Sequence, residues 1–185
     1  MALADHASDT MTALATASED DVFAIPTVEK QVYRDGMARL AAAVNIITST
    51  GEGGWVGFTA SAVTSVTDSP ATLLVCVNKG VQAHATLSAN RILCVNTVAG
   101  PHEDLAMAFA GGSKDMATRF AGAEWTTMVT GAPVLEGAAV AFDCRVSNIM
   151  SGASHDVFFC EVLAVRHSPE ADALVYHARK FHRLS

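Results

Sequence analysis

Small hydroxylated side chains and strand-end amides are the residues most able to bind a ligand in this chain. The run Gly57–Asn78, GFTASAVTSVTDSPATLLVCVN, begins with small and hydroxylated residues and ends with β-branched apolar ones. Hydroxyls on Thr59, Ser61 and Ser65 give its first half many donors and little bulk. A flat ligand with a polar edge could therefore lie against this strand, which we interpret as part of a cofactor site. An ordinary barrel strand with a solvated Thr/Ser face is the alternative.

Three further segments place polar or charged side chains at the ends of predicted strands. Asn78-Lys79-Gly80 ends one apolar run with an amide, a cation and a flexible residue, which suits a phosphate or an amide-edged ring. Asn96-Thr97 ends another apolar run. Ser154-His155-Asp156 places a histidine at a turn before a long strand. A strand-capping histidine and a solvated turn lysine are the alternatives for His155 and Lys79.

The usual nucleotide, hydrolase and metal motifs are missing from the sequence. There is no G-x-G-x-x-G, no G-x-x-x-x-G-K-[ST] and no G-x-S-x-G. The seven histidines match no H-E-x-x-H or zinc-finger spacing, so no metal site is expected. The four cysteines form no C-x-x-C pair and lie in apolar runs, which predicts buried free thiols in a reducing cytoplasm.

The elements that would position these residues are mostly strands. We expect strands over residues 43–50, 55–66, 71–78, 91–98, 138–150, 157–166 and 174–177. Short helices are expected over residues 28–40, 81–89, 101–110 and 113–120, with Ser113 capping the last. Strands and helices do not alternate regularly, so the predicted fold is mainly β. It is a split antiparallel β-barrel of Greek-key type with a helical insertion and short peripheral helices.

Composition excludes several classes of partner. The chain has 185 residues, a formal net charge of −7, 50% hydrophobic residues and 17% charged ones. This composition is typical of a globular protein and argues against nucleic acid or an anionic membrane as a partner. The high apolar content favours a subunit interface. Residues 1–28 are expected to form a flexible acidic tail and residues 29–185 the barrel domain.

Several ordered segments together resemble one known family, the short-chain flavin reductases of the split-barrel superfamily. The resemblance covers about residues 32–184. The segments that carry it are Arg34-Asp35-Gly36-Met37-Ala38, Ala43–Thr48, Gly57–Ala62, Val75–Asn78, Val95–Thr97, Arg119–Gly122, Gly131–Leu135 and His155-Asp156-Val157. Each segment is common alone, and their order and spacing are specific.

The resemblance implies a homodimer that binds FMN or FAD at its interface and reduces it with NADH or NADPH. It further assigns roles to particular residues of this sequence. Backbone amides and hydroxyls of Thr59, Ala60, Ser61 and Ala62 would meet the isoalloxazine edge; Ser65, Asn78 and Lys79 would lie near the ribityl chain and phosphate, with His84 as a substitute phosphate contact; Asn96 and Thr97 would add contacts; and His155 would border the nicotinamide. The turn reads Gly152-Ala153-Ser154-His155, a looser spacing than the family's commoner G-D-H.

The expected function is therefore an NADH-dependent flavin reductase that supplies reduced FMN or FAD to a partner monooxygenase in the cytoplasm. Two alternatives stay open at the level of sequence. One is a flavin-dependent corrinoid reductase that acts on cob(II)yrinic acid diamide in cobalamin synthesis. The other is a non-catalytic split barrel that binds flavin or haem. No arginine cluster for a 2′-phosphate is obvious, which favours NADH over NADPH.

Overall fold

The computed structural model describes residues 24–112 and 115–184, and the chain divides into two units after Met37. The described part of the first unit contains helix α2 (Lys30–Met37), none of whose side chains is buried. This confirms a helix within the expected range 28–40. Most of the expected tail, residues 1–23 of 1–28, lies outside the described residues, so the tail stays a prediction.

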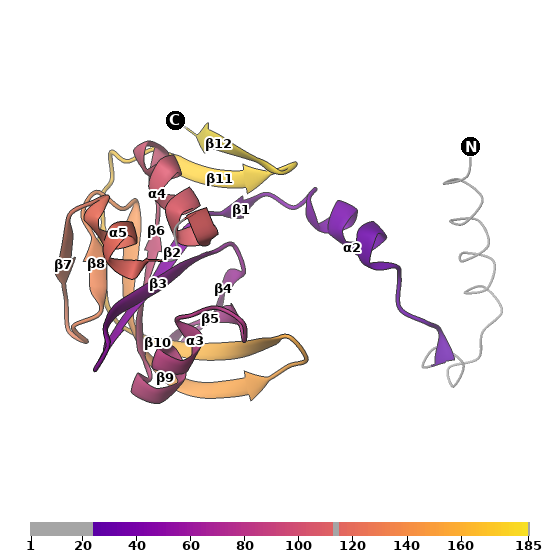
Figure 1. The fold of residues 1–185 in the computed structure, drawn as a ribbon, viewed down its shortest axis with the longest axis horizontal. Helices are drawn as coiled ribbons and strands as arrows, with labels where there is room; N and C mark the ends of the chain where they lie inside the picture. Colours follow the sequence, from indigo (N-terminus) through magenta and orange to yellow (C-terminus); the bar gives the residue numbers. More distant parts are fainter. Residues whose placement is uncertain (1–23, 113–114, 185) are drawn as a thin grey trace. The chain divides into compact units, whose positions relative to one another are not determined.

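The second unit, which begins at Ala38, is built on one seven-stranded antiparallel sheet (Figure 1). Its strands lie in the order β3-β2-β6-β9-β10-β5-β4. Their bounds are β2 Asn45–Gly51, β3 Gly54–Ala60, β4 Val63–Asp68, β5 Ala71–Asn78, β6 Ile92–Thr97, β9 Val140–Ser151 and β10 His155–His167. The predicted antiparallel β architecture is confirmed.

The split in the barrel falls between two strands that follow each other in the chain. β3 and β4 lie at opposite edges of the sheet, and no ladder joins these two fully described strands. The chain crosses between the edges at Ser61 and Ala62, where Val63 N donates to Ser61 O at 3.0 Å and Cys76 N donates to Ala62 O at 3.0 Å. The first of these bonds spans two residues, which makes a tight γ-turn. The prediction of one strand over residues 55–66 is therefore wrong.

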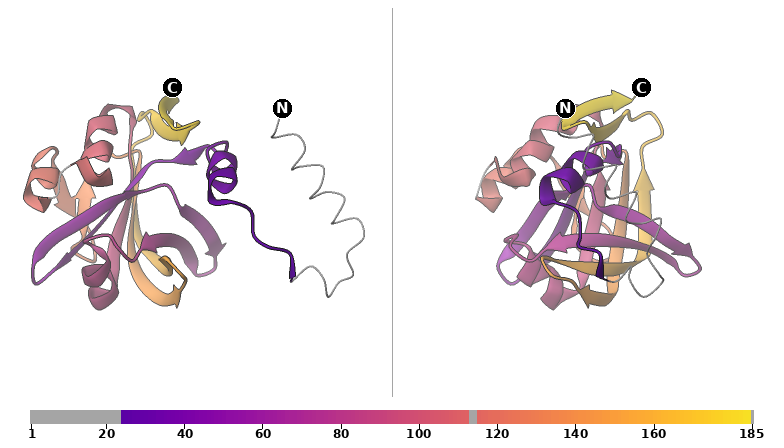
Figure 2. Two further views of the ribbon diagram at one scale, coloured as in Figure 1. Left: turned by 45° about the vertical axis from the view of Figure 1, so that its right-hand side comes forward. Right: turned by 90° about the vertical axis from the view of Figure 1, so that its right-hand side faces the viewer.

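Short elements surround the main sheet. A small sheet contains β1 (Ala42–Ala43), β11 (Ala173–His177) and β12 (Lys180–Leu184), and β7 (Trp125–Thr127) pairs with β8 (Pro133–Leu135). Helix α3 (His84–Asn90) lies at one end of the sheet. The helical insertion comprises η2 (Gly100–His102), α4 (Glu103–Met107), η3 (Ala108–Gly112) and α5 (Met116–Ala121). Figures 1 and 2 show α4 and α5 together, away from α3.

Two local predictions differ from the structure. The basic C-terminal residues form strand β12, which the expected strands, ending at residue 177, did not include. Ala178 and Arg179 make the hairpin turn with φ of 49° and 62°, in the left-handed region. Such turns usually carry Gly or Asn, so no turn residue marks this hairpin in the sequence. The expected cap Ser113 lies outside the described residues, and Asp115 caps α5 by accepting a hydrogen bond from Thr118 N at 2.8 Å.

Two hydrophobic clusters hold β3 between them. Inside the curved sheet, Phe58 and Phe158 pack with apolar residues of β2, β5 and β6. On the insertion side, Phe109 and Phe120 form a second cluster with Leu105. β3 contributes to the first cluster and is covered by the second, which fixes the strand that carries Thr59 and Ala60. No helix in the described residues is long and apolar enough to cross a membrane.

Candidate functional site

The end of β3 forms the wall of a hollow with a volume of about 320 Å³, which we call the first hollow. It gathers most of the strand-end residues that the sequence singled out, from β3, β5 and β10. Its lining comprises Phe58, Thr59, Ala60, Ser61, Ala62, Cys76, Asn78, Val81 and His155. Six of these nine were predicted site residues, so the structure brings Thr59–Ala62, Asn78 and His155 together.

Hydrogen bonds from three side chains fix the backbone of β3 next to the first hollow. Arg119, which is buried, donates from Nη1 to Gly57 O at 3.1 Å. Thr59 Oγ1 donates to Ala106 O of α4 at 2.7 Å. Asn45 Nδ2 donates to Ala60 O at 3.3 Å. The strand end is thus fixed on both sides, and a rigid frame of this kind positions a ligand better than a loop does.

His155 is held at the mouth of the first hollow by a short hairpin turn. It pairs with Asn78 across the β5–β10 ladder. Gly152 N donates to His155 O at 2.9 Å, and a Cβ on Gly152 would lie 2.6 Å from that same oxygen. Only glycine fits this close approach. Ser154 Oγ lies 2.9 Å from His155 Nδ1, within hydrogen-bond distance. The looser spacing of the turn therefore still brings the exposed imidazole to the hollow.

Asp156, the next residue, binds two of the predicted phosphate contacts. His84 Nε2 lies 2.8 Å from Asp156 Oδ2, and Lys79 Nζ lies 3.4 Å from Asp156 Oδ1. Lys79 Nζ also donates to Ser151 Oγ at 2.9 Å and to Gly152 O at 2.5 Å. The hydrogen bond from His84 lowers the pKa of Asp156, with smaller contributions from Ser151 and Lys79. Lys79 and His84 therefore brace the turn that carries His155, and neither lines the first hollow.

Asn96 lies outside the lining of the first hollow, and its side chain is hydrogen-bonded to protein. It is fully buried; its Nδ2 donates to Ile46 O and to Thr48 Oγ1, both at 3.1 Å, and its Oδ1 accepts from Leu135 N at 2.8 Å. These bonds join β2 and β6 to β8. The ligand-contact role expected for Asn96 stays a prediction, and these hydrogen bonds to protein argue against it.

Thr97 and Ser65 also lie away from the lining. Thr97 Oγ1 donates to Asn45 Oδ1 at 2.8 Å, and Asn45 in turn holds Ala60 O. Thr97 is thus linked to the lining residue Ala60 through Asn45. Ser65 is exposed on the edge strand β4, opposite Leu73.

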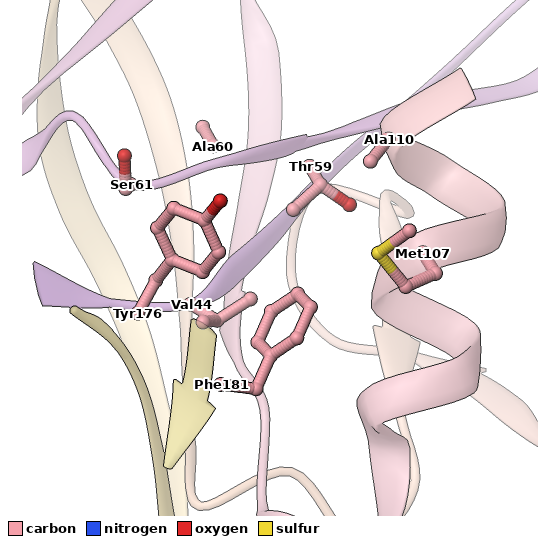
Figure 3. A pocket seen from close by; sticks show the side chains of 8 residues that line it. All are labelled: Val44, Thr59, Ala60, Ser61, Met107, Ala110, Tyr176 and Phe181. Carbon is pink, nitrogen blue, oxygen red and sulfur yellow. The ribbon is translucent and has the colours of Figure 1, made fainter. Parts of the chain in front are cut away.

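The sequence missed a second hollow, of about 340 Å³, on another side of the same strand end (Figure 3). Tyr176 of β11 and Phe181 of β12 line one side, and Met107 of α4 lies across from them. The remaining lining residues are Val44, Thr59, Ala60, Ser61 and Ala110. Tyr176 pairs with Phe181 across the β11–β12 hairpin. The sequence prediction missed this hairpin because Ala178 and Arg179 are not the residues that usually mark such a turn.

Within residues 24–112 and 115–184 there is no group of three or more His, Cys, Asp or Glu that could hold a metal ion. All four cysteines are free thiols. Burial raises the pKa of Cys94 and Cys144, and raises that of Cys160 to about 12. Cys76 is half-buried and is the one that lines the first hollow.

Comparison with known proteins covers the whole of the second unit. The family model described as "Flavin reductase like domain" matches residues 37–185. This chain belongs to that family. The expected resemblance is confirmed, and so is the fold.

Relatives of this flavin reductase family member match along most of its length. It is 54% identical over 172 residues to FMN reductase (NADH) RutF of Stutzerimonas stutzeri (strain A1501), covering 93% of this chain and 98% of the relative. The Streptomyces globisporus C-1027 NADH:FAD oxidoreductase SgcE6, in complex with NAD and FAD fragments, matches with a TM-score of 0.78 and 27% identity, covering 87% of this chain and 98% of that one. BorF, the flavin reductase component of a bacterial two-component tryptophan halogenase, matches with a TM-score of 0.77 and 28% identity, covering 84% and 98%.

Proposed function

We propose that this chain is an NADH-dependent flavin reductase whose flavin ring lies in the first hollow. The observation that carries the proposal is the gathering of Thr59–Ala62, Asn78 and His155 around one cavity in a member of the flavin reductase family. NADH as reductant and FMN as flavin are supported by the 54% identical relative, which is named FMN reductase (NADH). SgcE6 is named an NADH:FAD oxidoreductase, so FAD stays a second candidate flavin.

The lining of the first hollow fits a flavin. An isoalloxazine ring is flat, with an apolar benzenoid end and a polar pyrimidine edge. Phe58 and Val81 give the hollow an apolar part, while Ser61, Asn78 and His155 give it polar groups. The side chains of Ala60, Ser61 and Ala62 are small, so a ring could approach the backbone closely at the γ-turn. Such mixed lining is typical of cofactor pockets.

The residues of this chain would act by positioning. A bound flavin would supply the hydride-accepting chemistry. The protein's part is to hold two rings in contact, which needs no general acid or base. Arg119, Thr59 and Asn45 fix the strand end against which we propose that the ring lies. Donors near a developing negative charge stabilise it, and Ser61, which follows β3, and Asn78 of β5 are polar side chains available for this.

We propose that His155 borders the nicotinamide of NADH. It is exposed at the mouth of the first hollow, and its turn is braced by Lys79 and Asp156. His155→Ala should raise the Michaelis constant for NADH or slow flavin reduction, while the unfolding curve stays unchanged. An unaltered reductive half-reaction would remove His155 from the site. His167→Ala, which removes an exposed histidine at the other end of β10 and outside both hollows, serves as the matched control.

The decisive experiment is anaerobic mixing of the purified protein with FMN or FAD and each nicotinamide, followed by the flavin absorbance. Bleaching of FMN by NADH is the expected result. Flavin that binds but is not bleached would refute the reductase and favour the non-catalytic alternative. Reduction of a Co(II) corrinoid faster than free reduced flavin achieves it would favour the corrinoid alternative.

We also propose that the protein is a cytoplasmic homodimer that delivers reduced flavin to a partner monooxygenase. BorF serves a separate tryptophan halogenase, which supports delivery to a second enzyme. Val66, Met150, Leu163 and Val165 are large apolar side chains exposed on β4, β9 and β10, and an interface would cover such residues. Light scattering that reports a monomer at micromolar concentration would refute the dimer.

A further inference from the structure

A buried amide joins the end of β3 to the two strands beside it. In the sheet register, Asn45 of β2 lies opposite Ala60 of β3 on one side and opposite Thr97 of β6 on the other. Thr97 Oγ1 donates to Asn45 Oδ1 at 2.8 Å, and Asn45 Nδ2 donates to Ala60 O at 3.3 Å. Asn45 Nδ2 also donates to Ala43 O at 3.1 Å. Three residues in one row across the sheet therefore form a hydrogen-bonded chain that ends on the backbone of β3.

The partners of Asn45 fix the orientation of its amide. The residue is 3% exposed, so its polar atoms depend on partners within the protein. Its NH2 group faces two backbone carbonyls, which accept hydrogen bonds and cannot donate them. Turning the amide over would place Oδ1 against both of these oxygens. Donation from the Thr97 hydroxyl to Oδ1 favours the same orientation.

The orientation of Asn45 sets the direction of the peptide group that follows Ala60. This peptide is trans and planar, so its C=O and its N–H point in opposite directions. Ala60 O is held toward β2, and the N–H of Ser61 therefore points to the other side, where β3 is the edge of the sheet. The alternation of an antiparallel strand agrees, because Gly57 O, three residues earlier, points away from β2 and accepts from Arg119 of the insertion.

We propose that Asn45 and Thr97 are positioning residues that direct the Ser61 N–H toward the polar edge of a flavin in the first hollow. Ser61 lines that hollow and the two positioning residues do not, so they act on the ring through the backbone of β3. Val63 N donates to Ser61 O at 3.0 Å, which fixes Ser61 from its other side. A donor that is already in place needs no reorganisation when a ligand accepts its hydrogen bond. The inference rests on the proposed function, which places the flavin ring in the first hollow.

The first test compares the FMN dissociation constants of the wild type and two Thr97 variants, measured by the quenching of FMN fluorescence. Thr97→Val keeps the shape of the side chain and removes the donor to Asn45. FMN binding should weaken roughly threefold to tenfold, as expected for the loss of one hydrogen bond. Thr97→Ser keeps the hydroxyl and should bind FMN about as tightly as the wild type. If Thr97→Val also binds FMN as tightly as the wild type, the inference is wrong.

Thr48→Val is the matched control, because it makes the same chemical change on β2 itself. Thr48 is fully buried, its hydroxyl donates to Pro133 O of β8, and it lines neither hollow. The variant should lower the free energy of unfolding in urea and leave FMN binding unchanged. Equal weakening of FMN binding by Thr48→Val and Thr97→Val would indicate a general loss of packing and would overturn the inference.

A double-mutant cycle separates positioning from direct contact with the flavin. Asn45→Ala should weaken FMN binding at least as much as Thr97→Val, because it removes the donor to Ala60 O itself. If Thr97 acts only through Asn45, Thr97→Val should add nothing in the Asn45→Ala background. Additive effects would make Thr97 a ligand contact and would overturn its positioning role. In the steady state, Thr97→Val should raise the Michaelis constant for FMN and leave that for NADH unchanged.

Failure of the proposed function would look different from failure of this positioning role. A wild type that binds and reduces FMN, together with a Thr97→Val variant that binds it equally well, would overturn only the role of Asn45 and Thr97. A wild type that neither binds nor bleaches FMN would overturn the proposed function, and the positioning role with it.

Discussion

Gly57 is the point where the β3 backbone meets the second hydrophobic cluster, so Gly57→Ala should lower both stability and activity. A Cβ there would lie 2.8 Å from Phe109 Cε1 and 3.0 Å from Ile47 O. Phe109 is 1% exposed and packs against Phe120 and Trp125, with ring centroids 5.0 and 5.8 Å away. Neither neighbour can retreat without disturbing the cluster or the β2–β3 ladder.

The magnitude follows from two opposing terms. Overpacking of a filled core costs about 1–3 kcal/mol. Replacing glycine by alanine recovers about 0.4–1 kcal/mol through the unfolded chain. The free energy of unfolding should therefore fall by about 1–2 kcal/mol, which for a chain of this size lowers the Tm by about 2–8 °C. Because Gly57 O accepts the Arg119 hydrogen bond, a shift of β3 should also raise the Michaelis constant for FMN.

The assay is urea unfolding followed by the fluorescence of Trp55 and Trp125, in parallel with FMN kinetics. Gly53→Ala, in the same hairpin, is the control, because a Cβ at Gly53 would meet nothing within 4 Å. It should leave both stability and kinetics within error of the wild type. If Gly57→Ala were as stable as Gly53→Ala, the close packing of Phe109 on β3 would be refuted.

Three further predictions concern residues around the site. Asn96→Leu should destabilise the protein by about 1–3 kcal/mol for each buried group left unpaired, with the Michaelis constant for FMN unchanged; a raised constant at full stability would make Asn96 a ligand contact. Asp156→Asn should be less stable than wild type at neutral pH, because the pKa of Asp156 is lowered in the folded state. Its stabilising contribution is complete above about pH 4 and is lost as the pH falls through the lowered pKa, so unfolding curves of wild type and variant should converge in acid. Cys76 should be the single thiol that a water-soluble disulfide reagent modifies in the native protein, and FMN should protect it; modification of a second thiol would contradict the burial of the other three.

The polar residues at the strand ends were predictable from the sequence, because each is marked by neighbouring apolar or turn residues. Hydroxyls at Thr59 and Ser61 and the amide of Asn78 follow or end apolar runs, and His155 sits beside a Gly-containing turn. Antiparallel pairing of β5 with β10 then brings Asn78 and His155 side by side. The many strand-like segments, which do not alternate regularly with helices, also indicated the β architecture. The kink at Ala62 was missed because Thr59–Val66 reads as one continuous run of small and β-branched residues.

Side-chain partners were decided by tertiary contacts. Lys79 and His84 follow a strand end just as a phosphate-binding pair would, yet Asp156, more than seventy positions along the chain, binds both. Asn96 resembles Asn78 as a strand-end amide, but β8 covers it and takes its hydrogen bonds. The sequence shows that a polar group ends a strand; it does not show which distant segment will pack over that end.

By itself, then, the sequence determined the strand content and the residues at the end of β3, because periodicity and turn chemistry act over a few residues. The family followed from the resemblance of ordered segments to a known family. The tertiary structure decided that β3 ends between two hollows, one lined by Asn78 and His155 and the other by Tyr176 and Phe181. That arrangement depends on the C-terminal hairpin and the helical insertion packing around the same strand. Contacts between segments so far apart in the chain leave no signature in local sequence.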